Sequence, residues 1–366
     1  MKKGYDYILI YIVLALLVIG WIMVYSSSAV VAEITYNDSF KFLKKQLLFS
    51  LIGLIGLVGA MKIDYRRLNA HTYLILALSI LLLVLVLIPG LGLSLRVGVA
   101  RRWLTTPWLT FQPSEFGKLA LVIFIAYSLT KKGDKIKEFL RGFLPVITIS
   151  GVMILLVILE PDMGTAIFMG MLTMTLLFIG GARFSYLLAI PLIAAPGFYF
   201  FITRFPYAYR RFIAYLHPWK DMQGMGFQII QSFVALGSGG PWGVGLGDGK
   251  QKLFFLPAAH TDFILAILGE EAGFIGIMVV ILLFALLIWR GVRISLKTED
   301  TFGSHLAMGI TCMIALQVII NMGVVLGLLP TKGLTLPFIS YGGTSLVMNL
   351  VGVGILLSIS ASGEKK

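Results

Sequence analysis

The sequence contains little cysteine, little histidine and little charge. Cys312 is the single cysteine among 366 residues, which excludes an intramolecular disulfide. There are four histidines, and His260 has no second histidine or cysteine near it at the spacing of a metal site. Charged residues make up 13% of the chain and hydrophobic residues 58%, which excludes an ordinary soluble domain. The composition therefore predicts a polytopic membrane protein.

Strict alternation of apolar and polar residues is also missing, so the membrane segments are predicted to be helices and not barrel strands. A helix needs roughly 20 apolar residues to cross a bilayer. Ten runs of about this length are found, at residues 7–26, 46–61, 73–91, 114–130, 144–160, 164–181, 186–203, 263–289, 305–329 and 338–359. No boundary suggests a second domain, and residues 1–366 are expected to form one all-α domain with ten transmembrane helices.

The basic residues of the short loops indicate the orientation. With the N-terminus in the cytoplasm, 16 lysines and arginines lie on the inner side, against seven in short loops on the outer side. Cytoplasmic loops carry the excess of lysine and arginine in membrane proteins, so both termini are predicted to be cytoplasmic. The net charge of +13 is thus mainly a topology signal, and no nucleic-acid partner is expected.

One long loop interrupts this pattern, from about residue 204 to 262, between the seventh and eighth predicted helices. Loops of this length are usually functional or disordered. This one is rich in aromatic and apolar residues, which disordered linkers lack. It is expected to fold onto the extracytoplasmic surface.

Charged side chains within the predicted membrane region are functional candidates, because an ionised group at the bilayer centre costs on the order of 2.5–3.5 kcal/mol. In QPSEFGK, which begins at Gln112, Glu115 and Lys118 are three residues apart and share one face of a helix. They can therefore form an ion pair. A purely structural pair, with Ser114 capping the helix, is an alternative of equal weight.

The motif LEPDMGT lies between the fifth and sixth predicted helices. Its proline ends one helix, and Asp162 can cap the next, where the helix dipole favours an anion. Capping is the favoured interpretation of this residue from the sequence.

A basic and aromatic cluster is predicted on the outer side. The stretches VARRWLTTPW and YAYRRF place Arg101, Arg102, Arg210 and Arg211 there, against the orientation rule. Guanidinium groups bind phosphate oxygens in pairs, so the cluster suggests a phosphate-bearing ligand. Contact with lipid headgroups, with Trp103 as an interfacial anchor, is an alternative of comparable weight.

The stretch AHTDFILAILGEEAGFIG brings three carboxylates to one predicted helix. Asp262 lies at the outer entrance, and Glu270 lies about 12 Å deeper at 1.5 Å per residue. Relative to Asp262, Glu270 is turned by about 80° and Glu271 by about 180°, so the three cannot share one site. Glu270 and Glu271 are predicted to be structural partners of polar groups on neighbouring helices. His260 is an alternative base beside Asp262.

Several long motifs together resemble the SEDS family, the multi-pass FtsW, RodA and SpoVE proteins that polymerise lipid II outside the membrane. The motifs are QPSEFGK, EPDMGT, GFQIIQSFVALGSGGPWGVGLGDGKQKLFFLP, AHTDFILAILGEEAGFIG and LLPTKGLTLPFISYGGTS. They occur in the same order as in that family and cover nearly the whole chain. TKGLTLPFISYGG and GDGKQKLFFLP are more similar to the division branch, FtsW, than to the elongation branch, RodA.

The resemblance implies that Asp262 is the catalytic general base of an inverting glycosyl transfer. A GlcNAc 4-hydroxyl of one lipid II attacks the MurNAc C1 of a chain carried on undecaprenyl pyrophosphate. The pyrophosphate leaves as an anion and calls for a cation, where a glycosidase uses a second carboxyl group. No metal ligand is assigned, and a role for Mg²⁺ or Mn²⁺ at the pyrophosphate stays open. The predicted substrate-binding residues are Arg101, Arg102, Trp103, Gln112, Glu115, Lys118, Asp162, Arg210, Arg211 and His260.

The resemblance also implies a setting and partners. The enzyme would lie in the cytoplasmic membrane with its active site facing outwards, and would work with a class B penicillin-binding protein transpeptidase and other division proteins. Two alternatives stay open, a lipid II flippase and a scaffold of the division machinery. The charges cluster toward the outer face, which favours surface chemistry over transport at the midplane.

Overall fold

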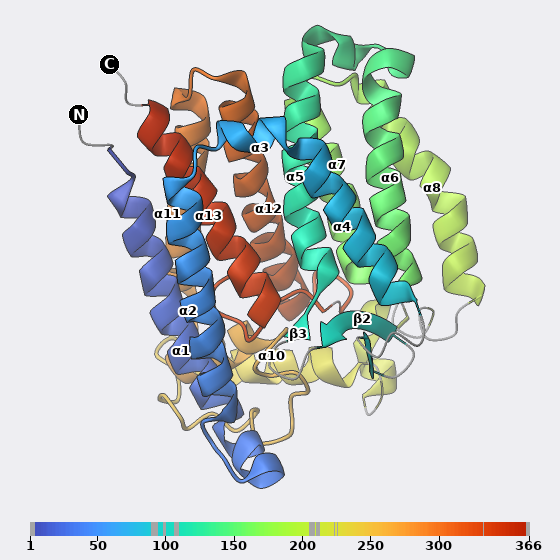
Figure 1. Ribbon diagram of the computed structural model, residues 1–366. Coiled ribbons are helices and arrows are strands. Elements are labelled where there is room, and N and C mark those ends of the chain that lie inside the picture. The colour runs from blue at the N-terminus through green and yellow to red at the C-terminus, as the bar shows by residue number, and fades with distance from the viewer. Residues whose placement is uncertain are drawn as a thin grey trace.

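The structure is a computed structural model that describes residues 4–88, 94–97, 100–105, 110–204, 209, 213–222, 224, 226–331 and 333–363. Figure 1 shows a bundle of helices that run mostly along one direction. Each of the ten predicted apolar runs overlaps one long helix. The long helices are α1 (Tyr7–Tyr36), α2 (Lys41–Lys62), α4 (Thr72–Leu87), α5 (Pro113–Lys132), α6 (Leu144–Leu159), α7 (Met163–Ile179), α8 (Phe184–Arg204), α11 (Ile264–Lys297), α12 (Thr301–Val325) and α13 (Gly343–Gly363).

Six spans in the described chain are long and apolar enough to cross a membrane: α1, α2, Phe139–Leu159 (α6 with the turn before it), α11, α12 and α13. α4 and α7 are apolar but shorter, with 16 and 17 residues. Large apolar side chains on the outer faces, such as Tyr11, Leu74 and Leu192, are exposed. Water would disfavour so much exposed apolar surface and lipid would cover it. The chain is therefore an all-helical, multi-pass membrane protein.

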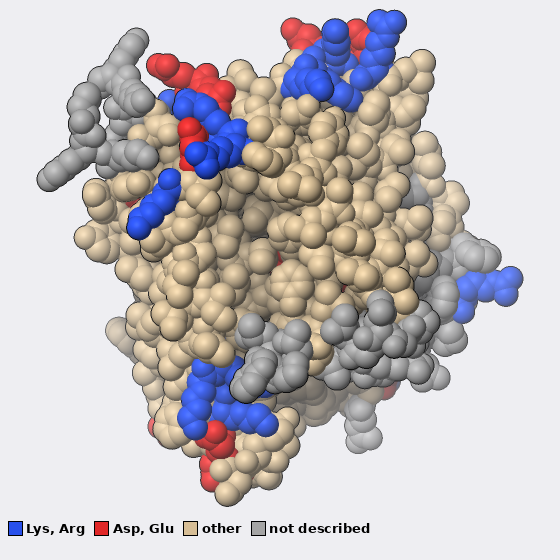
Figure 2. Space-filling view, viewed as in Figure 1, with Lys and Arg blue, Asp and Glu red and all other residues tan. Residues whose placement is uncertain are grey.

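The bundle has two distinct ends. Both chain termini lie at one of them, which we call the terminus end (Figure 1). We call the opposite end, where α5, α7 and α11 begin, the site end. In Figure 2 most of the charged side chains gather toward the two ends of this face, with a band of uncharged residues between them. This distribution is the one expected of a protein that crosses a bilayer.

Two helix ends differ from the predicted apolar runs. α1 continues to Tyr36, where Asn37 adopts a left-handed conformation (φ 55°) and donates its N–H to the Glu33 carbonyl. α13 begins at Gly343, because the residues before it form a turn in which the Leu336 N–H donates to Ser340 Oγ at 2.9 Å. The hydropathy of the sequence does not predict the end of α1 or the start of α13.

A small sheet lies between α4 and α5, which the all-α prediction did not include. It has three antiparallel strands in the order β1 (Ser94–Val97), β2 (Ala100–Thr105) and β3 (Thr110–Phe111). Strands this short give no periodic signal in an apolar sequence. β2 contacts α4 and α5, so the sheet lies at the site end beside the start of α5.

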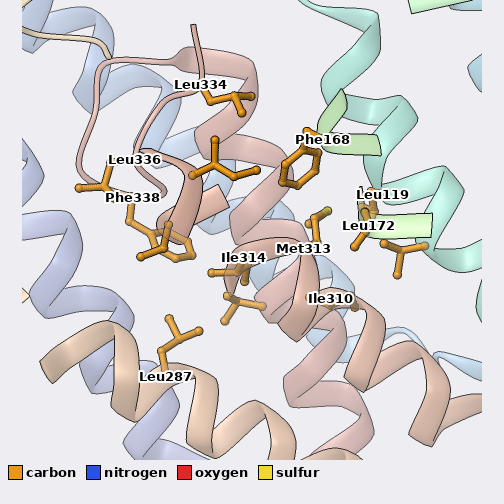
Figure 3. Packing of buried hydrophobic residues seen from close by; sticks show 14 of the residues in the cluster. Leu119, Phe168, Leu172, Leu287, Ile310, Met313, Ile314, Leu334, Leu336 and Phe338 are labelled. Carbon is orange, nitrogen blue, oxygen red and sulfur yellow. The ribbon is translucent and has the colours of Figure 1, made fainter. Parts of the chain in front are cut away.

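The centre of the bundle is built around α5, α12 and α13. Nearly every residue in the first three turns of α5 is buried, including its charged residues. In Figure 3 Leu119 of α5, Leu172 of α7 and Met313 of α12 lie side by side in the apolar core. The core therefore surrounds the first turns of α5 on several sides.

The long loop after α8 is folded where it is described. It contains a 3-10 helix η3 (Pro218–Asp221) and the helix α10 (Phe227–Gly239). A side chain at Gly239 would overlap the carbonyl of Gly269, so α10 packs closely on α11. Ser232 Oγ of α10 also donates to the Val325 carbonyl at 2.8 Å. These contacts hold the loop against the bundle at the site end.

α11 is broken at Gly273, whose backbone has φ 67° and ψ −166°. Glycine adopts such angles readily, and a side chain here would also overlap the backbone of Gly243 in the long loop. Residues 264–271 before the break are all buried, whereas many residues after it, such as Phe274, are exposed. α11 thus consists of a buried entry segment (264–272) and an outer segment (274–297).

Candidate active site

Asp262 lies at the site end, two residues before α11 begins at Ile264. Its backbone carbonyl accepts a hydrogen bond from Asn321 Nδ2 at 2.9 Å. The same amide donates to the Leu334 carbonyl at 2.7 Å, and Asn321 is buried on α12. These two bonds tie the backbone of Asp262 to α12 and to the α12–α13 loop (residues 326–342).

The α12–α13 loop lies alongside the residues that lead into α11. Ser340 Oγ donates to the Thr261 carbonyl at 2.6 Å. Gly333 is next to the side chain of Asp262, and a methyl group added there would lie 3.4 Å from Asp262 Oδ2. Asp262 itself is only partly buried. The α12–α13 loop therefore flanks both the side chain of Asp262 and the backbone before it.

His260 is half-buried among aromatic rings. Its ring centroid is 4.6 Å from that of Phe42 on α2 and 5.7 Å from that of Tyr341. Its carbonyl accepts the Tyr341 N–H at 2.9 Å. Burial lowers the pKa of His260, which favours the neutral ring. These contacts position the residues before Asp262, and a role for His260 as a base stays a prediction.

Glu115 and Lys118 form the predicted ion pair in the first turns of α5. Lys118 Nζ lies 2.8 Å from Glu115 Oε1, and both side chains are buried. Nζ also lies 5.1 Å from the centroid of the Phe168 ring on α7. Glu115 Oε2 has no hydrogen-bond partner among the described residues, which is unusual for a buried carboxylate.

The predicted capping by Ser114 is wrong. α5 begins one residue earlier, at Pro113, and Gln112 occupies the capping position without a side-chain cap. Ser114 Oγ is buried, with no hydrogen-bond partner in the described part of the chain. Proline is favoured in the first turn of a helix because it needs no amide hydrogen there, which explains the shift.

Asp162 caps α7, as predicted, and also links two other elements. Its carboxylate accepts the Thr165 N–H at 3.2 Å and the Thr165 hydroxyl at 2.9 Å. Gln112 Nε2 donates to the same carboxylate at 3.2 Å, and Arg102 Nη1 lies 3.8 Å from it. The start of α5, the start of α7 and strand β2 therefore meet at Asp162.

Glu160 belongs to this cluster and was not singled out in the sequence analysis. It is fully buried, and neither carboxyl oxygen has a hydrogen-bond partner among the described residues. Burial, together with the nearby carboxylate of Asp162, raises the pKa of Glu160 to about 9, and Arg102 opposes this shift. The available signal was a second acidic residue in LEPDMGT, at the end of an apolar run.

Arg102 holds the backbone of the α6–α7 turn. Its Nε donates to the Glu160 carbonyl at 3.4 Å, and its Nη2 donates to the Pro161 carbonyl. Gln112 then connects the turn to α13, since its N–H donates to Thr344 Oγ1 at 3.1 Å. The Asp162 cluster and the loop that holds Asp262 are thus parts of one hydrogen-bonded structure.

The other residues of the predicted basic cluster are only partly placed. Arg101 pairs with Arg96 in the strand backbone, and Trp103 pairs with Leu95 and is partly buried. The side chain of Arg101 lies outside the described residues. The two arginines of YAYRRF, Arg210 and Arg211, also lie outside the described residues. Arg102 is therefore the member of the cluster whose contacts with the site are defined.

Glu270 and Glu271 make structural contacts, but the predicted partners on neighbouring helices are largely wrong, because most of the partners belong to the long loop and Ser26 of α1 is the helical one among the described contacts. Glu270 accepts the backbone N–H of Lys250 at 2.7 Å and that of the next residue at 3.2 Å. Glu271 Oε1 lies 2.6 Å from Lys252 Nζ and accepts the Ser26 hydroxyl of α1 at 2.6 Å. The two carboxylates fasten the loop to the entry segment of α11.

A divalent metal was left open by the sequence, and the described residues offer it no complete set of protein ligands. They contain no group of three or more histidine, cysteine, aspartate or glutamate side chains suited to a metal. Asp162 is already engaged by Thr165, Gln112 and Arg102. A metal at this site would thus depend on substrate phosphates for several ligands, as Mg²⁺ often does.

The fold and these groups define a class of protein, an all-helical membrane protein with carboxylates and cations buried at one end of its bundle. Residues 7–365 match the profile of a protein family described as "cell cycle protein", which covers FtsW, RodA and SpoVE. The chain belongs to this family, which confirms the resemblance seen in its motifs.

Individual relatives agree over nearly the full length. The chain is 46% identical over 358 residues to the probable peptidoglycan glycosyltransferase FtsW of Geobacter sp. (strain M18), covering 98% of this chain and 97% of that protein. It is 47% identical over 359 residues to stage V sporulation protein E of Bacillus subtilis (strain 168), covering 98% of each.

Solved structures show the same fold. The rod shape determining protein RodA of Thermus thermophilus superposes with a TM-score of 0.72 and 26% identity, over 100% of this chain and 99% of that one. A chain in a structure described as "Structural coordination of polymerization and crosslinking by a peptidoglycan synthase complex" superposes with a TM-score of 0.79 and 27% identity, over 99% of both chains.

Proposed function

We propose that the protein is a peptidoglycan glycosyltransferase that polymerises lipid II into glycan strands during cell division. Relatives 46% identical over 98% of the chain carry the name of this activity. The observation that carries the proposal is the placement of Asp262, a partly exposed carboxylate at the entrance of α11. Its backbone is held by Asn321 and by a loop with the division-type motif TKGLTLPFISYGG.

Asp262 acts in this proposal as the general base of a single displacement. Its carboxylate takes the proton of the acceptor GlcNAc 4-hydroxyl while that oxygen bonds to the donor MurNAc C1. The bond from C1 to the pyrophosphate oxygen breaks at the same time, and its electron pair leaves with the pyrophosphate. One base and one displacement produce the inversion from an α to a β linkage.

Arg102 and Lys118 are proposed to bind the donor's anionic groups. The 3.8 Å separation between Arg102 Nη1 and Asp162 Oδ1 is a loose ion pair, so Nη1 can bind a phosphate while Nε and Nη2 hold the α6–α7 turn. Lys118 lies in the first turns of α5, the helix for which Gln112 is the N-cap residue. Cations placed where charge develops stabilise a leaving anion more strongly in a site of low dielectric constant.

The proposal includes a topology and a partner. Ten transmembrane helices, with both termini in the cytoplasm, would put the site end on the outer face of the cytoplasmic membrane. The arginine and lysine distribution and the shared position of both termini at the terminus end support this arrangement. The likeness to a chain of a peptidoglycan synthase complex supports a crosslinking partner, a class B penicillin-binding protein.

Polymerisation of lipid II by the purified protein tests the function. We expect Asp262→Asn to lose glycan synthesis by at least about 100-fold, because removing a general base typically costs 10²–10⁴-fold. The matched control is Asp248→Asn, an exposed carboxylate of the same loop, which should polymerise normally. Full polymerisation by a well-folded Asp262→Asn protein would contradict the role of this residue.

The same preparation separates the two alternative functions. In liposomes, movement of lipid II across the bilayer without glycan product would support a flippase and count against the polymerase. In cells, normal division by a variant that makes no polymer would support a scaffold. Adding and withholding Mg²⁺ or Mn²⁺ and the partner transpeptidase shows which of them the reaction requires.

A further inference from the structure

A basic cleft lies at the terminus end, far from the proposed active site. It has a volume of about 280 Å³ and opens between the start of α1, the end of α11 and α13. Its charged lining residues are Arg290, Arg293 and Lys297 of α11 and Asp6, which precedes α1. Three cations and one carboxylate leave a net charge of +2 in the lining. The cleft lies at the end of α11 and Asp262 lies just before its start, so the two are at opposite ends of the bundle.

The single carboxylate of the lining is fully engaged. Asp6 Oδ2 accepts hydrogen bonds from Arg290, at 2.8 Å from Nε and with Nη2 at 2.6 Å. Asp6 Oδ1 accepts the Leu9 N–H at 3.1 Å and so caps α1. Arg293 and Lys297 have no carboxylate within ion-pair distance in the part of the chain that the structure describes. Among the described residues, these two cations of the lining are therefore the ones available to an anion in the cleft.

The spacing of the basic residues on α11 brings their positive charges together. Positions 290, 293 and 297 are three and four residues apart, so the cations lie along one face of α11, where like charges repel. The N-terminus of α1 contributes Tyr7 and Ile8 to the lining. A helix N-terminus carries positive partial charge and backbone N–H groups without intrahelical partners. An anion in the cleft would reduce the repulsion between the cations and would accept hydrogen bonds from these N–H groups.

The surroundings of the cleft indicate that the anion belongs to a lipid. Trp289 is exposed, and the guanidinium groups of Arg290 and Arg293 each lie 5.6 Å from its ring. Tryptophan and arginine at the end of a membrane helix are typical of the headgroup level. Ile8 and Ile294 line the cleft and Ile8 is 52% exposed, so an acyl chain has an apolar surface to follow.

We propose that this cleft binds the phosphodiester headgroup of an anionic phospholipid from the leaflet at the terminus end. Basic pockets between transmembrane helices suit such headgroups. Arg293 and Lys297 contact the phosphate, while Arg290 stays paired with Asp6 and shapes the floor of the cleft. The proposal concerns binding, so it stands or falls independently of the glycosyltransferase activity.

The test compares lipids on the purified full-length protein by native mass spectrometry and thermal unfolding. Phosphatidylglycerol and phosphatidylcholine with identical acyl chains are added separately, and inorganic phosphate is added alone as a third arm. We expect retention of phosphatidylglycerol to exceed that of phosphatidylcholine at least fivefold, with a higher Tm. Inorganic phosphate should not reproduce the rise in Tm, and an equal rise would overturn the lipid assignment in favour of a free anion.

A double variant assigns the effect to the cleft. Arg293→Gln/Lys297→Gln removes the two available cations and leaves the Asp6–Arg290 pair intact. Arg67→Gln/Lys135→Gln is the matched control, because it removes one exposed arginine and one exposed lysine at the same end. We expect the first variant to lose the preference for phosphatidylglycerol and the control to keep it. An unchanged preference in the first variant, or no preference in the unaltered protein, would show that the cleft does not bind this lipid.

Discussion

Glu160 lies in an environment that strongly disfavours the ionised form of its carboxyl group. Its buried carboxyl group lies near Asp162, and the two causes together raise its pKa to about 9 from an ordinary value of 4.5. The unfolded chain would release this proton near pH 4.5, whereas the folded protein keeps it up to about pH 9. The folded state binds more protons between these values, so the contribution of Glu160 to stability decreases as pH rises through that range.

Glu160→Gln should therefore stabilise the protein at alkaline pH. Glutamine keeps the shape of the neutral acid and removes the cost of holding a proton, so we expect Tm at pH 8 to rise by several degrees. The gain should shrink at pH 5, where the wild-type group is protonated at little cost. Scanning calorimetry or fluorescence in detergent measures both values. An exposed control, Glu33→Gln, should change neither, and an equal gain at both pH values would contradict the assigned pKa.

Variants of the Glu115–Lys118 pair can distinguish a role in stability from a role in polymerisation. Glu115→Gln leaves the lysine charge buried without its partner, which typically costs about 3–5 kcal/mol, so we expect Tm to fall by more than about 5 °C. Glu115→Gln/Lys118→Met removes both charges and should recover most of that loss. We expect neither variant to polymerise lipid II. Recovery of polymerisation in the double variant would mean that the pair is purely structural.

Some of these residue contacts were predictable from local spacing. The ion pair follows from a separation of three residues, and the capping role of Asp162 follows from the proline before it. The environment of Glu160 did not follow, because it depends first on burial within the packed bundle and then on contacts such as that with Arg102, which is 58 residues away in the chain. Sequence patterns report neighbours on one helix, but not neighbours from another element.

Among the elements, α11 gives the clearest prediction. Gly273→Ala forces a side chain into a left-handed backbone conformation and against Gly243, so we expect a loss of about 1–3 kcal/mol in stability. The matched control is Gly151→Ala in the middle of α6, where an added methyl group meets no atom within 4 Å. That substitution should stabilise the helix slightly. Comparable Tm values for the two variants would contradict the importance of the break.

Helices were the most predictable elements, because a run of apolar residues is a strong and continuous signal. The break at Gly273 was not predicted, since GEEAGF reads as continuous helix and the reason for the break is the long loop packed against it. The sheet beside α4 was missed for a related reason. Its strands of two to six residues are shorter than any window that could distinguish them.

At the scale of the whole molecule, the single cysteine makes the orientation measurable. In a Cys312→Ser background, Asp248→Cys places an exposed thiol at the site end and Glu299→Cys places one at the terminus end. A membrane-impermeant maleimide should label the first on intact spheroplasts and the second only after lysis. The opposite pattern would invert the proposed topology and move the active site to the cytoplasm.

The assembly of the site is the part that no local pattern could predict. Gln112 bonds to Thr344, 232 residues away, and Asn321 bonds to the carbonyl of Asp262, 59 residues away. The family resemblance identified these motifs, but their joining through α13 and the α12–α13 loop depends on the packing of the complete bundle. The predicted site residues with described side chains lie at one end of that bundle.

The break in α11 also has a mechanical meaning. Beyond Gly273, the outer segment has 24 residues and a length of roughly 36 Å, enough to follow the thickness of the surrounding bilayer by tilting. The entry segment before it is clamped by Glu270, Glu271 and the long loop. The loop also bonds to the chain beyond the break, where the Phe274 N–H donates to the Gly240 carbonyl at 2.9 Å and the Ile275 N–H donates to the Pro241 carbonyl at 3.2 Å. The long loop thus replaces the helical hydrogen bonds that the break interrupts, and it splices the two segments of α11 into one support for Asp262.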